Sequence, residues 1–126
     1  MASGIPAVLS WIVAKKPKRR WIKTVDEEFT LAKPRKGAKL RREVWQTEDR
    51  EVVRYSLAYI NHRICGRDNG RVLGYDNSHD GHHRHFMGSV EPVELDSYEA
   101  IVEQFEDELT QIWRKEDEEA KRQGNR

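Results

Sequence analysis

The sequence predicts an α+β protein in which an antiparallel meander sheet of about four strands carries a C-terminal amphipathic helix on one face. Three observations lead to this fold class. Leu40–Gln46 and Val53–Tyr59 show the two-residue alternation of strands. Asn69-Gly70 is a hairpin signal that precedes further strand-like residues. Tyr98–Trp113 repeats apolar residues every three or four positions, as one face of a helix does.

The first two predicted strands differ in how clearly they alternate. Leu40–Gln46 alternates irregularly, with arginines on both of its faces. Val53–Tyr59 is clearer, because Tyr55, Leu57 and Tyr59 share one face and suit a pleated surface. We therefore place these two tyrosines in the core.

The later strands lie on either side of a polar loop. Val72–Tyr75 forms the return strand after Asn69-Gly70, both of which tolerate positive φ. Asp76–Gly81 is rich in turn-forming residues and is expected to be a loop. His83–Val93 is expected to be the last strand, interrupted near Gly88 and Pro92.

The final element is the predicted helix, which Asp96 or Ser97 caps at its start. Its apolar face is formed by Tyr98, Ile101, Val102, Phe105, Leu109, Ile112 and Trp113. Beyond Trp113 the only apolar residue is Ala120, so we expect the helix to fray into a polar tail.

The length of 126 residues suits one domain. We divide it into a basic N-terminal extension (1–38), a core domain (39–113) and a polar C-terminal tail (114–126). The single cysteine, Cys65, excludes an intrachain disulfide and is expected to fill core space. The apolar run Ile5–Ala14 is too short to span a membrane, and positive charges follow it instead of preceding it, unlike a signal peptide. The expected location is the cytoplasm, without membrane association.

The net charge of +1 hides a strong asymmetry along the chain. Residues 15–42 hold twelve Lys/Arg and three acids, a net +9, and residues 94–119 hold eleven acids and two bases, a net −9. Two interpretations stay open. The basic half contacts an anionic partner such as RNA, or the charges of the two halves pair or are simply solvated.

The candidate RNA-binding residues lie in or beside this basic stretch. They are Arg19, Arg20, Lys39 and Arg41. Trp21 lies between these basic residues and Trp45 lies just after them, where they either stack on bases or fill the core. For Trp45 we favour the core.

The most unusual feature is a cluster of histidines, since four of the five lie between residues 79 and 85. Histidine suits general acid–base cleavage of RNA, because its ordinary pKa lies near neutrality. In a strand, His83 and His85 project from one face and are the candidate acid and base. Arg84 is the candidate phosphate ligand, although it points to the other face, and Asp76 is the candidate that orients an imidazole.

Two other interpretations of this segment remain open. His83 and His85, with Asp76 or Asp80, supply enough ligands for a transition metal, although no cysteine pair or helical histidine motif accompanies them. Alternatively, the segment is a solvated turn whose His85 packs under the helix. The catalytic hypothesis requires neither a metal nor a cofactor.

Several motifs together resemble one family. They are Tyr55–Tyr59 (YSLAY), Gly74–Asn77 (GYDN), Gly81–His85 (GHHRH), Gly88, Glu91-Pro92 and the closing helix. In this order they resemble the TumE family of small toxins, over roughly Leu40 to Trp113. The family often has Asp where this chain has His82, which leaves Asp76 or Asp80 to supply a carboxylate.

The resemblance implies the toxin of a toxin–antitoxin pair, whose partner is typically a helix-turn-helix antitoxin. Endoribonuclease activity through the His-Arg-His motif is an analogy with other small toxins. RNA and a second copy of the chain are the other partners that we consider. The alternative is a non-catalytic module that binds nucleic acid or protein, with structural or metal-binding histidines.

Overall fold

The computed structural model describes residues 19–124, so the expectation for Ile5–Ala14 lies outside the described residues. The strands are β1 (Ile22–Thr30), β2 (Lys39–Gln46), β3 (Val52–Ile60), β4 (Arg71–Asp76), β5 (His82–Phe86) and β6 (Ser89–Val93). A short 3-10 turn, Asp68–Gly70, precedes β4, and the helix α2 spans Tyr98–Gly124.

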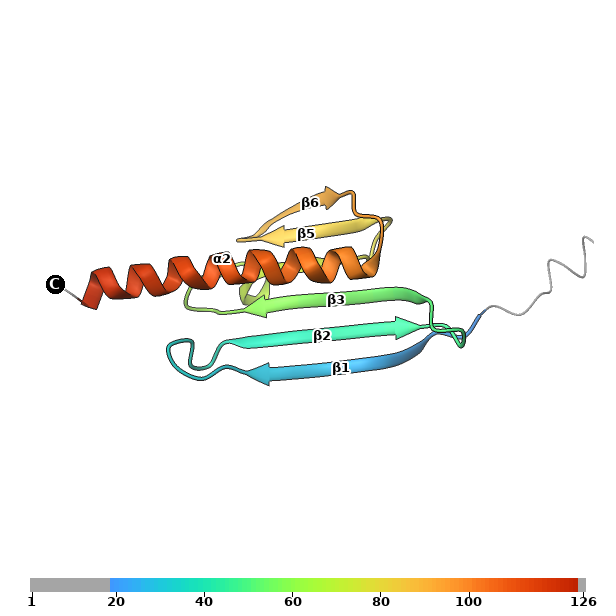
Figure 1. The fold of residues 1–126 in the computed structure, drawn as a ribbon, viewed down its shortest axis with the longest axis horizontal. Coiled ribbons are helices and arrows are strands. Elements are labelled where there is room, and N and C mark those ends of the chain that lie inside the picture. Colours follow the sequence, from blue (N-terminus) through green and yellow to red (C-terminus); the bar gives the residue numbers. More distant parts are fainter. Residues whose placement is uncertain (1–18, 125–126) are drawn as a thin grey trace, which may run out of the picture.

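The sheet is an antiparallel meander in the order β1-β2-β3-β4-β5-β6 (Figure 1). The topology is confirmed, but the sheet has six strands and not four. β1 gave no alternation signal because both of its faces are largely solvated, and cross-strand ion pairs such as Arg42–Glu27 (3.0 Å) accompany its pairing with β2. The boundary that we placed at residue 38 falls at the end of the loop between these two strands.

The segment His83–Val93 forms two strands instead of one. Phe86 pairs with Ser89, so the turn between them has two residues. These residues are Met87, at φ 50°, and Gly88, at φ 90°. Two consecutive positive φ values are typical of the tight turns that match the twist of a hairpin.

Helix α2 packs across β3 and β4. The backbone N–H of Ala100 donates to the Ser97 hydroxyl at 3.1 Å, so Ser97 is the cap. The expectation that the helix frays after Trp113 is wrong, because the helix continues to Gly124 and projects past the sheet (Figure 1). Its last turns are rich in residues with high helix propensity, which explains why they need no apolar face.

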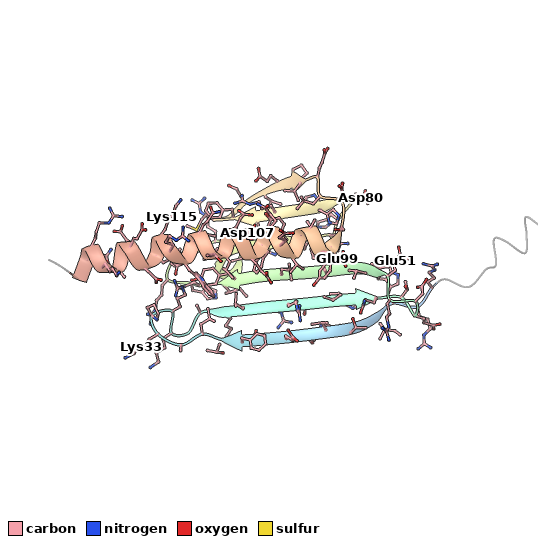
Figure 2. The ribbon with its side chains drawn as sticks, viewed as in Figure 1. Lys33, Glu51, Asp80, Glu99, Asp107 and Lys115 are labelled. Carbon is pink, nitrogen blue, oxygen red and sulfur yellow. The ribbon has the colours of Figure 1, made fainter. Side chains whose placement is uncertain are left out.

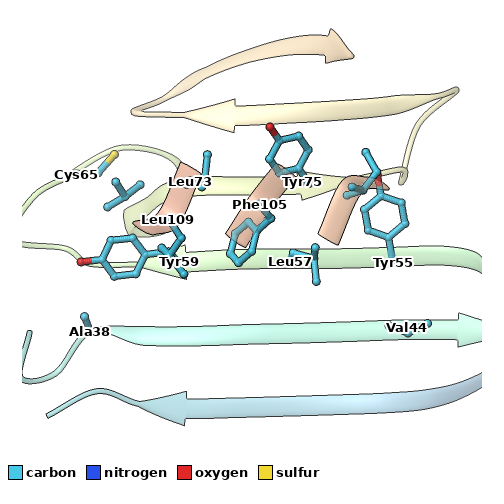
Figure 3. Packing of buried hydrophobic residues seen from close by; sticks show 12 residues of the cluster. Ala38, Val44, Tyr55, Leu57, Tyr59, Cys65, Leu73, Tyr75, Phe105 and Leu109 are labelled. Carbon is cyan, nitrogen blue, oxygen red and sulfur yellow. The ribbon is translucent and has the colours of Figure 1, made fainter. Parts of the chain in front are cut away.

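The core lies between α2 and the central strands (Figure 3). Tyr55, Tyr59 and Cys65 are buried there, as the sequence predicted. Trp45 is an exception. It is half-buried on the other side of the sheet, while Trp21 is 57% exposed, so the core interpretation is wrong for both.

The two faces of the sheet differ in character. We call the face under α2 the covered face and the opposite one the open face. Tyr75 lies on the covered face, since its hydroxyl donates to Glu108 of α2. The outer side of α2 is charged (Figure 2 labels Glu99, Asp107 and Lys115). In the part of the chain that the structure describes, no helix has the length and apolarity to cross a membrane.

One ion pair attaches β5 to the helix. Arg84 forms a charge-assisted pair with Glu108 and reaches the exposed Glu91 at 3.1 Å. Partial burial favours protonation of Glu108, but hydrogen bonds from Arg84 and Tyr75 outweigh it and lower the pKa of Glu108 below its ordinary value. The pair therefore stabilises the fold at neutral pH and weakens as the pH falls through that lowered pKa.

We expect Glu108→Gln to lower the free energy of unfolding by about 2 kcal/mol at pH 7, because it removes a charged hydrogen-bond partner from a largely buried site. The matched control is Glu91→Gln, which removes the exposed carboxylate partner of Arg84. It should lower the free energy of unfolding by less than about 0.5 kcal/mol. Urea unfolding measures both. Equal costs would show that Glu108 does not anchor the helix.

Candidate active site on the open face

The strand register brings Asp76, His83 and His85 together on the open face. Tyr75 pairs with Arg84, and both side chains reach Glu108 of α2. Since side chains alternate, the next cross-strand pair, Asp76 and His83, lies on the open face. His85 follows His83 by two residues, so it shares that face.

His85 lies between two carboxylates. Its Nδ1 is 3.1 Å from Oδ2 of Asp68, and its Nε2 is 2.9 Å from Oδ2 of Asp76. A neutral imidazole has one N–H, so it can donate to only one of the two. Both contacts become donor–acceptor contacts when the ring is protonated, which makes His85 a candidate proton donor.

Arg71 ties the two carboxylates together. Its Nη2 and Nε donate to the two oxygens of Asp68 at 2.8 and 2.9 Å, and its Nη1 reaches Asp76 at 3.4 Å. These hydrogen bonds from Arg71 lower the pKa of Asp68 below its ordinary value, against the effect of partial burial. Ser78 adds a hydroxyl that donates to Asp76 at 3.1 Å. We call these five residues, Asp68, Arg71, Asp76, Ser78 and His85, the Asp–His cluster.

Gly74 makes room for Arg71. A Cβ at this position would lie 2.5 Å from Cδ of Arg71 and 3.1 Å from the carbonyl oxygen of Leu57. The register between β3 and β4 also shifts between Tyr59 and Ile60. This irregularity interrupts the simple alternation of β4 next to Arg71, and the arginine side chain lies across Gly74 toward Asp76.

The other three residues of the His-His-Arg-His segment, His82, His83 and Arg84, have different surroundings. His83 is half-buried, and its Nδ1 is buried without a hydrogen-bond partner. His82 lies on the covered face, where its Nδ1 is 2.7 Å from the Tyr55 hydroxyl. Arg84 is also on the covered face and binds Glu108, so the structure does not bring it to His83 and His85.

Asn77 fixes the loop that follows Asp76. Its side chain accepts from the backbone N–H of Tyr55 at 2.9 Å and donates to the carbonyl of Val53 at 3.1 Å. The amide therefore replaces a residue of the strand ladder and holds the end of β4 against β3. In the Gly-Tyr-Asp-Asn motif, Asn77 therefore has a structural role, and Asp76 supplies the carboxylate of the cluster.

The predicted RNA-binding residues are spread over one end and the open face of the sheet. Three of them lie close to carboxylates: Arg19 to Glu51 (2.6 Å), Lys39 to Glu28 (3.5 Å) and Arg41 to Glu28 (3.4 Å). Arg20 is exposed. The basic residues of the strands are thus paired mostly with nearby acids, while Arg35 reaches Glu116 of α2 at 3.0 Å.

Within residues 19–124, no three His, Cys, Asp or Glu side chains converge as metal ligands. A hollow of about 770 Å³ lies between the C-terminal half of α2 and residues such as Arg35 and Arg63, and it shares no residue with the Asp–His cluster. The cluster lies instead on the open face of the sheet, where the register of β4 and β5 places Asp76 and His85.

Asp68, Arg71 and Ser78 are the cluster residues that sequence reasoning missed. Asp68 lies among turn-forming residues, and Arg71 stands at the start of a strand, where an arginine is unremarkable. A glycine inside a strand, Gly74, was the one local signal, since it marks a close approach of other atoms.

Residues 23–114 match the family model described as Toxin TumE, which is well over half of the chain. Neither curated proteins nor solved structures give a match to this chain.

We expect Asp68→Asn to lower the free energy of unfolding at pH 7 by about 2 kcal/mol, because it removes the charge that Arg71 and His85 face. The pKa of Asp68 is lowered in the folded state, so its contribution is complete above the ordinary carboxyl pKa of about 3.9 and is lost as the pH falls through the lowered value. Urea unfolding at several pH values should therefore show wild type and variant converging in acid. Asp80→Asn, in the exposed loop, is the control and should change little at any pH.

We expect Gly74→Ala to cost about 1–3 kcal/mol of stability, because the new methyl group meets Arg71 and the Leu57 carbonyl. Gly66→Ala is the matched control, since a Cβ there meets nothing within 4 Å. The control should stay within about 0.5 kcal/mol of wild type in urea unfolding. If both variants lose a similar amount of stability, Arg71 does not depend on the missing side chain at Gly74.

Proposed function

We infer the function of this chain from one premise: it belongs to the TumE family, whose model is described as Toxin TumE. It is therefore a toxin of a toxin–antitoxin system, and an antitoxin is its partner. We propose that the toxin is a small endoribonuclease that needs no metal and that works at the Asp–His cluster and His83.

The proposed reaction is transfer of a phosphodiester to the neighbouring ribose hydroxyl. His83 takes the proton of the 2′-hydroxyl, the 2′-oxygen bonds to phosphorus, and the bond to the 5′-oxygen breaks. His85 gives the proton on its Nδ1 to that leaving oxygen, which takes the place of Asp68 at this nitrogen, while Asp76 orients the ring through Nε2. Each such proton transfer contributes on the order of 10²–10⁴-fold to the rate.

The observation that carries the proposal is the position of the His85 ring. Its Nε2 lies 2.9 Å from Asp76, its Nδ1 lies 3.1 Å from Asp68, and it shares the open face with His83. A protonated ring carries an N–H at each nitrogen, so it can donate to Asp76 through one and to the substrate through the other. Arg84 takes no part in this scheme, and we assign it to the attachment of α2.

A second candidate is a non-catalytic binding module in which the cluster is structural. The favouring observation is its closure: the side chains of His85 and Asp76 are 12% and 10% exposed, and their polar atoms contact one another. Fully satisfied polar networks of this kind rigidify a fold without any chemistry.

The test is induction of the full chain in a bacterial host, with growth and total RNA followed over time. We expect wild type to stop growth and cleave RNA, and His85→Asn and His83→Ala to lose at least 100-fold of the cleavage rate. The control is His82→Gln, from the same motif but on the covered face, which should keep activity.

Folding of each variant is checked by circular dichroism and thermal unfolding. Folded His83 and His85 variants with wild-type activity would refute the catalytic assignment and leave the binding module. Growth arrest without RNA cleavage would refute the ribonuclease but not the toxin.

A further inference from the structure

A phosphodiester substrate needs a cation beside the site, and the obvious candidates are engaged. Arg84 is on the covered face with Glu108, and the hydrogen bonds of Arg71 go to Asp68 and Asp76. Neither guanidinium is free to bind a phosphate without losing a carboxylate partner. The substrate must find its cation elsewhere on the open face.

Arg54 of β3 differs from the other basic residues of the sheet. Six of the seven Lys and Arg residues in the strands lie within 4 Å of a carboxylate, namely Lys23, Lys39, Arg41, Arg42, Arg71 and Arg84. Arg54 is the seventh, it is exposed, and within the described strands it makes no ion pair. An exposed arginine without an acid retains its full attraction for an anion.

Trp45 holds this arginine in place. Trp45 and Arg54 are cross-strand partners, and the Arg54 guanidinium lies over the indole, 5.5 Å from its centroid. Lys23 lies over the same ring at 5.0 Å. Lys23 forms an ion pair with Asp26 at 3.0 Å. Of the two cations over the indole, Lys23 is therefore paired with an acid and Arg54 is not.

Arg54 is also close to the Asp–His cluster. Ser56 pairs with Asp76 across β3 and β4, and Arg54 precedes Ser56 by two residues on the same face. Arg54 and Asp76 are therefore diagonal neighbours on the open face, roughly 7–8 Å apart. The Asn77 amide, bonded to the backbone of Tyr55, holds the two strands at this spacing.

We propose that Arg54, positioned by Trp45, is the phosphate-binding subsite of this toxin and that it binds single-stranded RNA next to the Asp–His cluster. The inference rests on the proposed function, because it takes RNA as the substrate. An unpaired guanidinium that lies over an aromatic ring on an open sheet face fits a flexible single strand, whose bases and phosphates both reach the surface.

The test measures binding apart from cleavage. The probe is a fluorescent single-stranded RNA with 2′-O-methyl riboses, which lack the hydroxyl that attacks phosphorus. We expect Arg54→Gln to weaken binding by the full chain roughly tenfold and to reduce the slope of log affinity against log salt by about 0.7, the value for one phosphate. Trp45→Leu should weaken binding less, and Trp45→Phe should restore part of the loss.

The matched control is Arg63→Gln, an exposed arginine in the loop after β3. Equal losses in Arg54→Gln and Arg63→Gln would refute the subsite, and so would an unchanged salt slope or a wild type that does not bind the probe. If Arg54→Gln binds like wild type while folded His85→Asn still fails to cleave ordinary RNA, the subsite is wrong and the proposed ribonuclease stands.

Discussion

The two-residue period of β5 governs the arrangement of this molecule. It divides His83, Arg84 and His85 between the faces of the sheet, although the three are contiguous in sequence. Arg84 is directed to the helix, where Glu108 receives it, and the histidines are directed to the open face. A motif that looks like one catalytic unit thus supplies both the attachment of α2 and the centre of the proposed chemistry.

The electrostatics of the open face follow from that division. With Arg84 on the other side, the carboxylates around His85 are balanced by Arg71, which reaches them because Gly74 has no side chain. Two acids, one arginine and one histidine form a nearly neutral group when the ring is protonated. Such a group adds little net attraction for RNA, which is why an unpaired cation nearby matters for binding.

The sequence predicted those features whose signals are local. The alternation in β3 and the helical period from Tyr98 to Trp113 correctly indicated strand, helix and core, and Asp76 and His85 were found because one short segment holds both. β1 was missed because a solvated edge strand needs no apolar face. Asp68 was missed because its approach to His85 depends on a loop and a register shift, which no spacing in the sequence reveals. Trp45 was misplaced because its ring packs against cations instead of the core.

Among the strands, only β3 and β4 make substantial contact with the helix. Packing against α2 therefore stabilises the centre of the sheet more than its outer strands. Amide hydrogens of the two central strands should exchange with solvent most slowly, and those of the outer hairpins should exchange through local opening. Asp76 belongs to the slowly exchanging centre and His85 to an outer hairpin. Their contact therefore exists only while that hairpin is closed, and the assembled cluster cannot outlive the β4–β5 ladder.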